Sequence, residues 1–192
     1  MTKYVKKEVF LHENCAIIIT NKRKGNIFME ICVCENEQQL IQLAETAKEI
    51  WNEYFISIIT QEQIDYMVEK FQSYPALEKA INEEHYTYFL AYEGKELIGF
   101  CGVKPEKERL FLSKLYLKKA YRGKGYASTL LKQAIAFAKE SKLDKIYLTC
   151  NKFNTHSLDV YKKKGFYEID AVQTDIGHGF IMDDYILQLD IA

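Results

Sequence analysis

The chain has 192 residues, 48% of them hydrophobic and 14% aromatic, which is enough apolar material for one sizeable core. Its formal net charge of −1 provides no general attraction to nucleic acid or to anionic membranes, so neither is expected as a partner. No apolar run approaches the roughly 20 residues that span a membrane, and we expect a cytoplasmic protein.

The cysteines and histidines show no pattern typical of a metal site. The five cysteines form no C-x-x-C pair, and Cys32 and Cys34 alternate within an expected strand. Small buried thiols in a reducing compartment explain them better than disulfides or metal ligands. The four histidines lack ligand spacing as well, so no metal is expected.

Residues 1–28 form an N-terminal extension in which lysines surround one apolar run, CAIIIT. Met29 opens a plausible strand, MEICVCE, and we hypothesise that it is the natural start and that the extension is not native coding sequence. A genuine N-terminal hairpin or tail is the alternative. Residues 29–192 then form a single domain.

From Met29 onward, hydrophobic periodicity predicts a strand, two or three helices and three antiparallel strands. Asn36 can cap the first helix, and Thr60 to Gln63 has the pattern of a capping box before the second. The predicted segments are a strand at 29–34, helices at 40–55, at 64–71 and after Pro75, a hairpin at 86–103 and a strand at 109–119.

The second half continues with a helix, a strand, a helix and two strands. Asn154 can cap the second of these helices, and Gly165 ends it as a C-terminal glycine does. The segments are a helix at 128–140, a strand at 145–150, a helix from 154 to 164, and strands at 165–174 and 180–190 around the turn 175–179. This order predicts an α/β layer architecture with a mixed sheet.

The stretch YRGKGYASTLL, at 121–131, predicts an anion-binding turn between a strand and a helix. Gly123 and Gly125 leave the backbone open to a phosphate, the helix adds its positive end, and the fork of Arg122 can bind an oxygen. The turn lacks the G-x-x-x-x-G-K-[S/T] pattern of a Walker A loop. Ser128 stands where a dinucleotide fingerprint needs its third glycine, so both of those readings are disfavoured.

Two motifs resemble the GNAT acetyltransferase superfamily. Arg122-x-x-Gly125-x-Ala127 is similar to its [Q/R]-x-x-G-x-[G/A] loop, and residues 154–166 are similar to its N-x-x-[A/S]-x-x-x-Y-x-x-x-G-F segment. The resemblance covers about residues 29–190 and implies that the central sheet is mostly antiparallel, with helices on both faces. It also implies an N-acetyltransferase with acetyl-CoA as the acyl-donor cosubstrate.

The resemblance further implies a set of residues around acetyl-CoA. Asn154, Ser157 and Tyr161 share one helix face, which the resemblance places along the pantetheine arm. Structural explanations also exist, with Asn154 as an N-cap and Tyr161 as a core aromatic. Lysines at 118, 119, 124 and 162–164 suit so anionic a ligand, or are solvated surface groups. The expected cofactor-binding residues are Leu115, Tyr116, Leu117, Arg122, Gly123, Lys124, Gly125, Tyr126, Ala127, Ser128, Asn154, Ser157, Tyr161 and Lys163.

The chemistry implied by the resemblance is direct attack of an amine on the thioester through a tetrahedral oxyanion. A backbone N–H near Leu117 would stabilise the oxyanion, and Tyr161 would protonate the leaving thiolate. Many family members carry a glutamate base on the preceding strand, whereas this sequence has Phe111 and Ser113 there. Ser113 can hold a water in a proton wire or bond to the backbone. The neighbouring pair Asp183–Asp184 is the best local acidic cluster, with a plain surface pair as the alternative.

The acceptor is expected to be a primary amine of a small molecule, such as a polyamine or an amino sugar. We assign Trp51, Tyr54 and Asp183 to its pocket, although core packing explains Trp51 and Tyr54 at least as well. The alternatives are a protein N-terminal or lysine acetyltransferase and a non-catalytic acyl-CoA-binding sensor. An uncovered edge strand would permit a homodimer.

Overall fold

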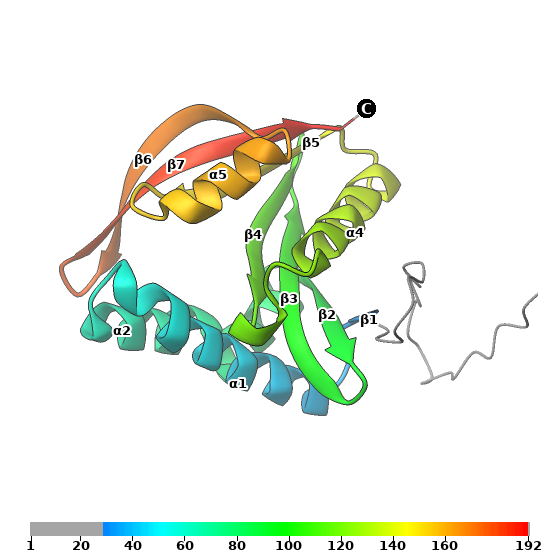
Figure 1. Cartoon of the computed structure of the whole chain (residues 1–192), viewed down its shortest axis with the longest axis horizontal. Coiled ribbons are helices and arrows are strands. Elements are labelled where there is room, and N and C mark those ends of the chain that lie inside the picture. Colours follow the sequence, from blue (N-terminus) through cyan, green and yellow to red (C-terminus); the bar gives the residue numbers. More distant parts are fainter. Residues whose placement is uncertain (1–28, 192) are drawn as a thin grey trace, which may run out of the picture.

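A computed structural model describes residues 29–191, in which seven strands form one sheet with helices on both faces (Figure 1). The strand order is β1-β2-β3-β4-β5-β7-β6, and every pairing except β4 with β5 is antiparallel. The predicted α/β class and mostly antiparallel sheet are confirmed. The hypotheses about residues 1–28 lie outside the described residues.

The elements occur in the predicted order. The strands are β1 (Met29–Val33), β2 (Thr87–Glu93), β3 (Glu96–Pro105), β4 (Leu110–Leu117), β5 (Lys145–Asn151), β6 (Tyr167–Gly177) and β7 (Phe180–Asp190). The α-helices are α1 (Glu37–Tyr54), α2 (Gln61–Gln72), α3 (Tyr74–Asn82), α4 (Tyr126–Glu140) and α5 (Thr155–Lys163). Two short 3-10 turns, η1 (Phe55–Ser57) and η2 (Lys119–Tyr121), follow α1 and β4.

Local side-chain chemistry accounts for the helix ends. The reciprocal capping box of the structure lies at Asn36, which exchanges hydrogen bonds with Gln39 at the start of α1. At the predicted box, the Thr60 hydroxyl accepts a hydrogen bond from the backbone N–H of Gln63, which begins α2. Gly165 has a φ of +93°, the left-handed conformation that ends a helix, and it follows α5 as predicted.

The central feature of the sheet is the divergence of β4 and β5 (Figure 1). These parallel strands pair only at Leu110 with Ile146 and at Phe111 with Tyr147, although both strands continue well beyond those pairs. The register between β3 and β4 shifts at Ser113, which is an extra residue in β4. Such a bulge bends its strand and increases the local twist, so β4 turns away from β5.

Three apolar clusters hold the layers together. The largest packs α4 and α5 against one face of the sheet and includes Leu112, Leu130 and Leu187. A second packs α1 and α3 against the other face over β1–β3. A third, around Trp51 and Ile64, joins α1 and α2 to the β6–β7 hairpin. The helices therefore enclose the β4–β5 divergence from both faces.

β6 is one of the two edge strands of the sheet, and most of its side chains are exposed. This is the kind of edge that permits pairing with a second chain, and the homodimer remains a prediction. No helix within residues 29–191 is long and apolar enough to cross a membrane.

Candidate active site

The backbone at the end of β4 points into the divergence. Lys118 N donates to Ile98 O at 2.9 Å, which makes these two residues a hydrogen-bonded pair of the β3–β4 ladder. Bonded and non-bonded pairs alternate in an antiparallel ladder, so the next pair, Gly99 with Leu117, is not hydrogen-bonded. The N–H and C=O of Leu117, and by the same alternation those of Leu115, therefore point away from β3 toward β5. We call the space between the diverging ends of β4 and β5 the opening.

The glycine turn lies next to this strand end. Gly123 and Gly125 have φ of +76° and +89°, and a Cβ at either position would meet no atom of the described chain within 4 Å. Gly125 is the N-cap of α4, and glycine has no side chain to bond the N–H groups of the first turn. Lys124, between the two glycines, is exposed, and its Nζ lies 5.0 Å from the ring centre of Tyr121. The turn is therefore open to an anion, as its sequence predicts.

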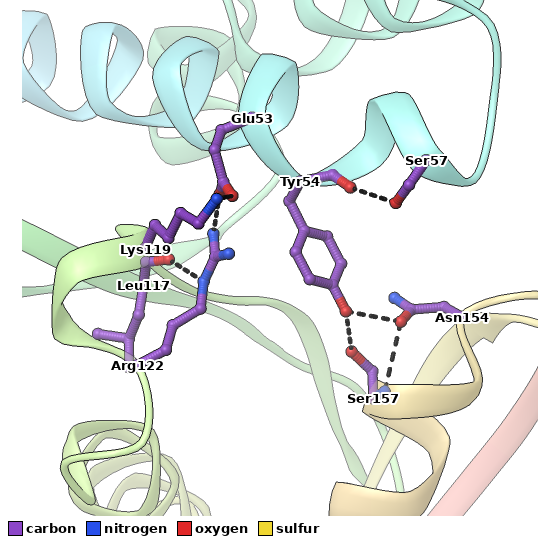
Figure 2. Close-up of polar contacts among 8 residues, drawn as sticks. All are labelled: Glu53, Tyr54, Ser57, Leu117, Lys119, Arg122, Asn154 and Ser157. Carbon is purple, nitrogen blue, oxygen red and sulfur yellow. Dashed lines mark hydrogen bonds and ion pairs between the residues drawn. The ribbon is translucent and has the colours of Figure 1, made fainter.

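Arg122 is held by the protein itself (Figure 2). Its Nη2 lies 2.5 Å from Glu53 Oε2, and its Nε donates to Leu117 O at 2.9 Å. The guanidinium also lies 4.9 Å from the ring centre of Tyr54. Glu53 additionally pairs with Lys119 at 3.6 Å. These contacts join the end of α1 to the glycine turn. Binding of Arg122 to a pyrophosphate remains a prediction, and it requires the Arg122 guanidinium to bind Glu53 and the pyrophosphate together.

A second polar contact passes through the opening. The Tyr54 hydroxyl on α1 donates to Asn154 Oδ1 at 2.8 Å and lies 3.1 Å from Ser157 Oγ at the start of α5 (Figure 2). Asn154 Oδ1 also accepts from Ser157 N at 3.3 Å, so Asn154 is the N-cap of α5. Because α1 and α5 pack on opposite faces of the sheet, Tyr54 reaches α5 only where β4 and β5 have separated.

Tyr161 lies on the α5 side of the same space. Its ring packs edge-on to Phe166 at 5.4 Å, against the largest apolar cluster. Burial raises the pKa of Tyr161, and the neighbouring Cys150 and Tyr116 raise it further. The hydroxyl therefore stays protonated at neutral pH and is able to donate a proton. Its two predicted explanations, core aromatic and proton donor, are compatible.

Aromatic side chains form the wall on the α1 side. Trp51 is 4% exposed, stacks on Phe55 with ring centres 4.3 Å apart, and meets Tyr116 edge-on at 6.2 Å. Its indole Nε1 has no hydrogen-bond partner among residues 29–191. Met182 of β7 packs on the same cluster. The predicted acceptor residue Trp51 is thus part of an apolar wall that carries one unused buried donor.

Ser113, predicted to hold a water, has a different neighbourhood. It lies at the bulge of β4, and its Oγ accepts from Lys114 Nζ at 3.2 Å. The Lys114 ammonium also lies over the rings of Tyr86 and Tyr88, and burial lowers its pKa to about 8. A part for Ser113 in proton transfer stays a prediction.

The two adjacent aspartates of β7 differ sharply. Asp183 Oδ1 lies 2.5 Å from Lys152 Nζ, and this hydrogen bond lowers the pKa of Asp183. Asp184 is 4% exposed, and its Oδ1 has no hydrogen-bond partner within residues 29–191. Burial raises the pKa of Asp184 to about 6, and the charge of Asp183 adds to this. Strand alternation predicts that one of the two faces inward, and the structure selects Asp184, which the sequence alone did not single out.

The lysines near the turn divide into two groups. Lys118 pairs with Glu49 at 3.0 Å and with Glu96 at 3.3 Å, so its charge is largely balanced by the protein. Lys163 at the end of α5 is exposed, as are both of its lysine neighbours. The sequence analysis treated these lysines as one group. The structure separates them, because Lys118 and Lys119 pair with glutamates that lie far away along the chain.

The diverging strands, the open glycine turn at the start of α4 and the partly buried Tyr161 together form a candidate site for the transfer of an acyl group. A model of the acetyltransferase (GNAT) family matches residues 44–166, more than half of the chain. The chain belongs to this family. It is an acetyl-CoA-dependent N-acetyltransferase, as the sequence motifs indicate.

Individual relatives agree with this assignment. The chain is 28% identical to the spermidine N(1)-acetyltransferase of Thermoplasma acidophilum over 150 residues, which are 76% of this chain and 91% of the relative. It is 34% identical to the spermine/spermidine N(1)-acetyltransferase of Bacillus subtilis over 86 residues, 40% of this chain and 56% of that protein. The crystal structure of the PaiA N-acetyltransferase of T. acidophilum in complex with coenzyme A superposes with a TM-score of 0.70 at 25% identity. That match covers 84% of this chain and 99% of the other.

Proposed function

We propose that this enzyme acetylates a primary amine of a small cationic molecule of the polyamine type. The observation that carries the proposal is the opening, because the N–H of Leu117, the ring of Tyr161 and an aromatic wall all border it. The relatives named spermidine and spermine acetyltransferases support the acceptor class. An apolar wall with an inward carboxyl group suits a flexible alkylamine, whose methylenes are apolar and whose ends are charged.

The residues of the chain fit acetyl-CoA. The uncapped first turn of α4 and the exposed Lys124 and Lys163 offer donors and positive charge to the diphosphate. The backbone groups of Leu115 that point into the opening can pair with the amides of the pantetheine arm. Acetyl-CoA supplies the reactive thioester. The remaining cofactor-binding residues predicted from the sequence lie at the end of β4, in the glycine turn, at the start of α4 and on α5.

The proposed chemistry uses two groups of the chain. The N–H of Leu117 donates to the oxygen of the thioester carbonyl as negative charge develops on it. Tyr161 donates its proton to the departing sulfur. The ordinary pKa values of about 10 for tyrosine and 8.5 for a thiol make this transfer uphill by about 2 kcal/mol. Burial raises the pKa of Tyr161, but a thiol in the same buried space is raised as well, so the difference stays small.

Contacts between α2 and the β6–β7 hairpin support a small acceptor rather than a peptide. Lys70 Nζ on α2 donates to Ile176 O in the β6–β7 hairpin at 2.6 Å, and the Tyr66 hydroxyl donates to the same oxygen. Phe180 packs against Tyr66 with ring centres 5.6 Å apart. Because these contacts join α2 to the hairpin, we expect less room beside the aromatic wall for an extended peptide backbone than for a slender alkylamine.

The test is a thiol-release assay with a panel of acceptors: spermidine, spermine, an aminoglycoside, and peptides with a free N-terminus or an internal lysine. Release with polyamines and not with peptides is the expected result. Release with peptides alone would overturn the acceptor class. Calorimetric binding of coenzyme A without release from any acceptor would instead identify a sensor.

A further inference from the structure

Asp184 is the one charged side chain among residues 29–191 that is more than nine-tenths buried. Its Oδ1 has no hydrogen-bond partner within that part of the chain. A buried ionisable group without a partner costs stability, which is why buried polar groups are almost always bonded. The unbonded oxygen of Asp184 is therefore available to a bound molecule.

Strand geometry places Asp184 on the acceptor side of the sheet. Asp184 pairs with Asn151 of β5 at the last register position before β5 ends. Side chains two apart on a strand share a face, so Asp184 faces the same way as Met182. Met182 packs against the cluster around Trp51. The carboxyl group and the aromatic wall therefore belong to one pocket.

Asp184 and Tyr161 also share two neighbours, one on each strand of the opening. Burial raises the pKa of both Tyr116 and Cys150, and the charge of Asp184 raises it further for each. The same two groups lie close enough to raise the pKa of Tyr161. Asp184 and Tyr161 thus flank the opening from its two faces, with Tyr116 on β4 and Cys150 on β5 between them.

We propose that Asp184 is a catalytic residue that takes the proton from the ammonium group of the acceptor. The proposal rests on the proposed function, whose chemistry so far lacks a general base for the acceptor amine, and it assigns that base. An alkylammonium with the ordinary pKa of about 10.4 is neutral in roughly one molecule in 2,500 at pH 7, so proton removal is needed before attack. β4 carries no acidic side chain between Leu110 and Leu117, and Asp184 supplies a carboxylate from a different strand.

The ammonium gives one proton to the Asp184 carboxylate, and the neutral nitrogen forms a C–N bond to the thioester carbon. The C–S bond then breaks, and the sulfur takes the proton of Tyr161. The Tyr161 phenolate regains a proton from the acetylated nitrogen. Asp184 finally releases its proton to solvent, so the net products are the amide, coenzyme A and one proton.

The surroundings of Asp184 set the pH range of this role. The titratable groups that interact with it electrostatically are Asp183 on its own strand, Lys152 after β5, Cys150 on β5 and Tyr116 on β4. Burial and Asp183 raise its pKa to about 6, and Lys152 opposes them. The carboxyl group is ionised at pH 7 and ready to accept a proton. Activity should therefore fall as the pH is lowered through about 6.

The decisive variant is Asp184→Asn, which keeps the shape and removes the base. With spermidine at pH 7, we expect kcat/KM to fall at least about 100-fold, while the Kd for acetyl-CoA stays within about threefold. The acid limb near pH 6 should vanish. The residual rate should rise about tenfold per pH unit up to about pH 10, because only free amine then reacts. Asp144→Asn, at the opposite end of β5 and exposed, is the matched control and should retain the wild-type profile.

Two further measurements separate a base from a structural residue. Asp184→Ala should regain activity with added formate, which replaces the missing carboxylate. Carbon-13 NMR of the enzyme without ligands should show one aspartate titrating near pH 6 that is absent in Asp184→Asn. Wild-type kcat/KM in Asp184→Asn at pH 7, or an unchanged acid limb, would overturn the role of Asp184 alone. A wild-type enzyme that acetylates no amine would overturn the proposed function, and this role with it.

Discussion

The acyl-donor half and the acceptor half of the proposed site are built from different kinds of groups. The donor half uses backbone atoms of the glycine turn and the end of β4, which lie within about a dozen consecutive residues. The acceptor half uses side chains of α1, β4 and β7, which meet only in the folded chain. Backbone groups near a motif are fixed by local conformation, whereas a pocket of side chains depends on how layers pack. The following variants test that contrast.

A large effect on turnover is expected from Tyr161→Phe, which changes the proposed proton donor on α5. Removal of the hydroxyl takes away the proton for the thiolate but leaves the buried ring, so turnover should fall by one to three orders of magnitude. Calorimetry should still detect acetyl-CoA binding. Tyr167→Phe, on the exposed strand β6, is the control and should leave turnover unchanged. Wild-type turnover in Tyr161→Phe would refute the assignment.

Asp184→Asn should stabilise the free enzyme, although it damages catalysis. Burial raises the pKa of Asp184 from 3.8 to about 6, so the folded state prefers the protonated carboxyl group. The stability that the protonated Asp184 carboxyl group contributes is therefore fully present below about pH 4 and is lost as the pH rises through about 6. A difference of about two pH units corresponds to up to about 3 kcal/mol in the free energy of unfolding.

Urea denaturation of wild type and Asp184→Asn at pH 4 and pH 7.5 tests this directly. The variant should gain stability relative to wild type only at the higher pH. An equal difference in the free energy of unfolding at both pH values would show that the charge of Asp184 does not destabilise the folded enzyme. Because the gain appears in the free enzyme, this measurement is independent of the acceptor.

Gly125→Ala should weaken donor binding by a purely backbone effect. The φ of +89° costs an L-residue about 1–2 kcal/mol, so stability should fall by that amount and the Kd for acetyl-CoA should rise about tenfold. Gly94→Ala, in the β2–β3 turn with φ of +63° and equally open space, carries a similar strain away from the site. It should lose similar stability and keep wild-type binding. Equal binding losses in both variants would count against the turn as the diphosphate site.

Glu53→Gln should have the smallest effect, because its ion pairs with Arg122 and Lys119 are partly exposed. Such pairs contribute about 0–1 kcal/mol, so the melting temperature should barely change. If Arg122 binds the diphosphate, its release from Glu53 should tighten acetyl-CoA binding severalfold. Glu49→Gln, which loses the pair with Lys118, should not change affinity. Weaker binding in Glu53→Gln would mean that Glu53 positions Arg122 instead.

Most secondary structure was predictable because its signals are local. The strand alternation, the caps at Asn36 and Asn154 and the stop at Gly165 each concern residues a few positions apart. The complete capping box was expected at Thr60 but lies at Asn36. The difference depends on whether a side chain at the third position folds back, which the residue types alone leave open.

The candidate site was predictable only where a motif carries it. The glycine turn and the Asn154–Tyr161 face follow from spacing along one helix start or one helix face. The contact of Glu53 with Arg122 joins residues 69 positions apart, and that of Tyr54 with Asn154 joins residues 100 apart. No local pattern encodes such pairs, because loops of any composition can bring them together.

By itself, the sequence determined the order of the elements, the open turn at Gly125 and the tyrosine of α5. These depend on backbone conformation and on periodicity, which short stretches of chain already specify. Only the tertiary structure decided that β4 and β5 part after Phe111, and that Asp184 rather than Asp183 turns into the space between the layers. Burial is a property of all the surrounding layers at once, and it is burial that makes one of two identical neighbouring side chains a candidate base.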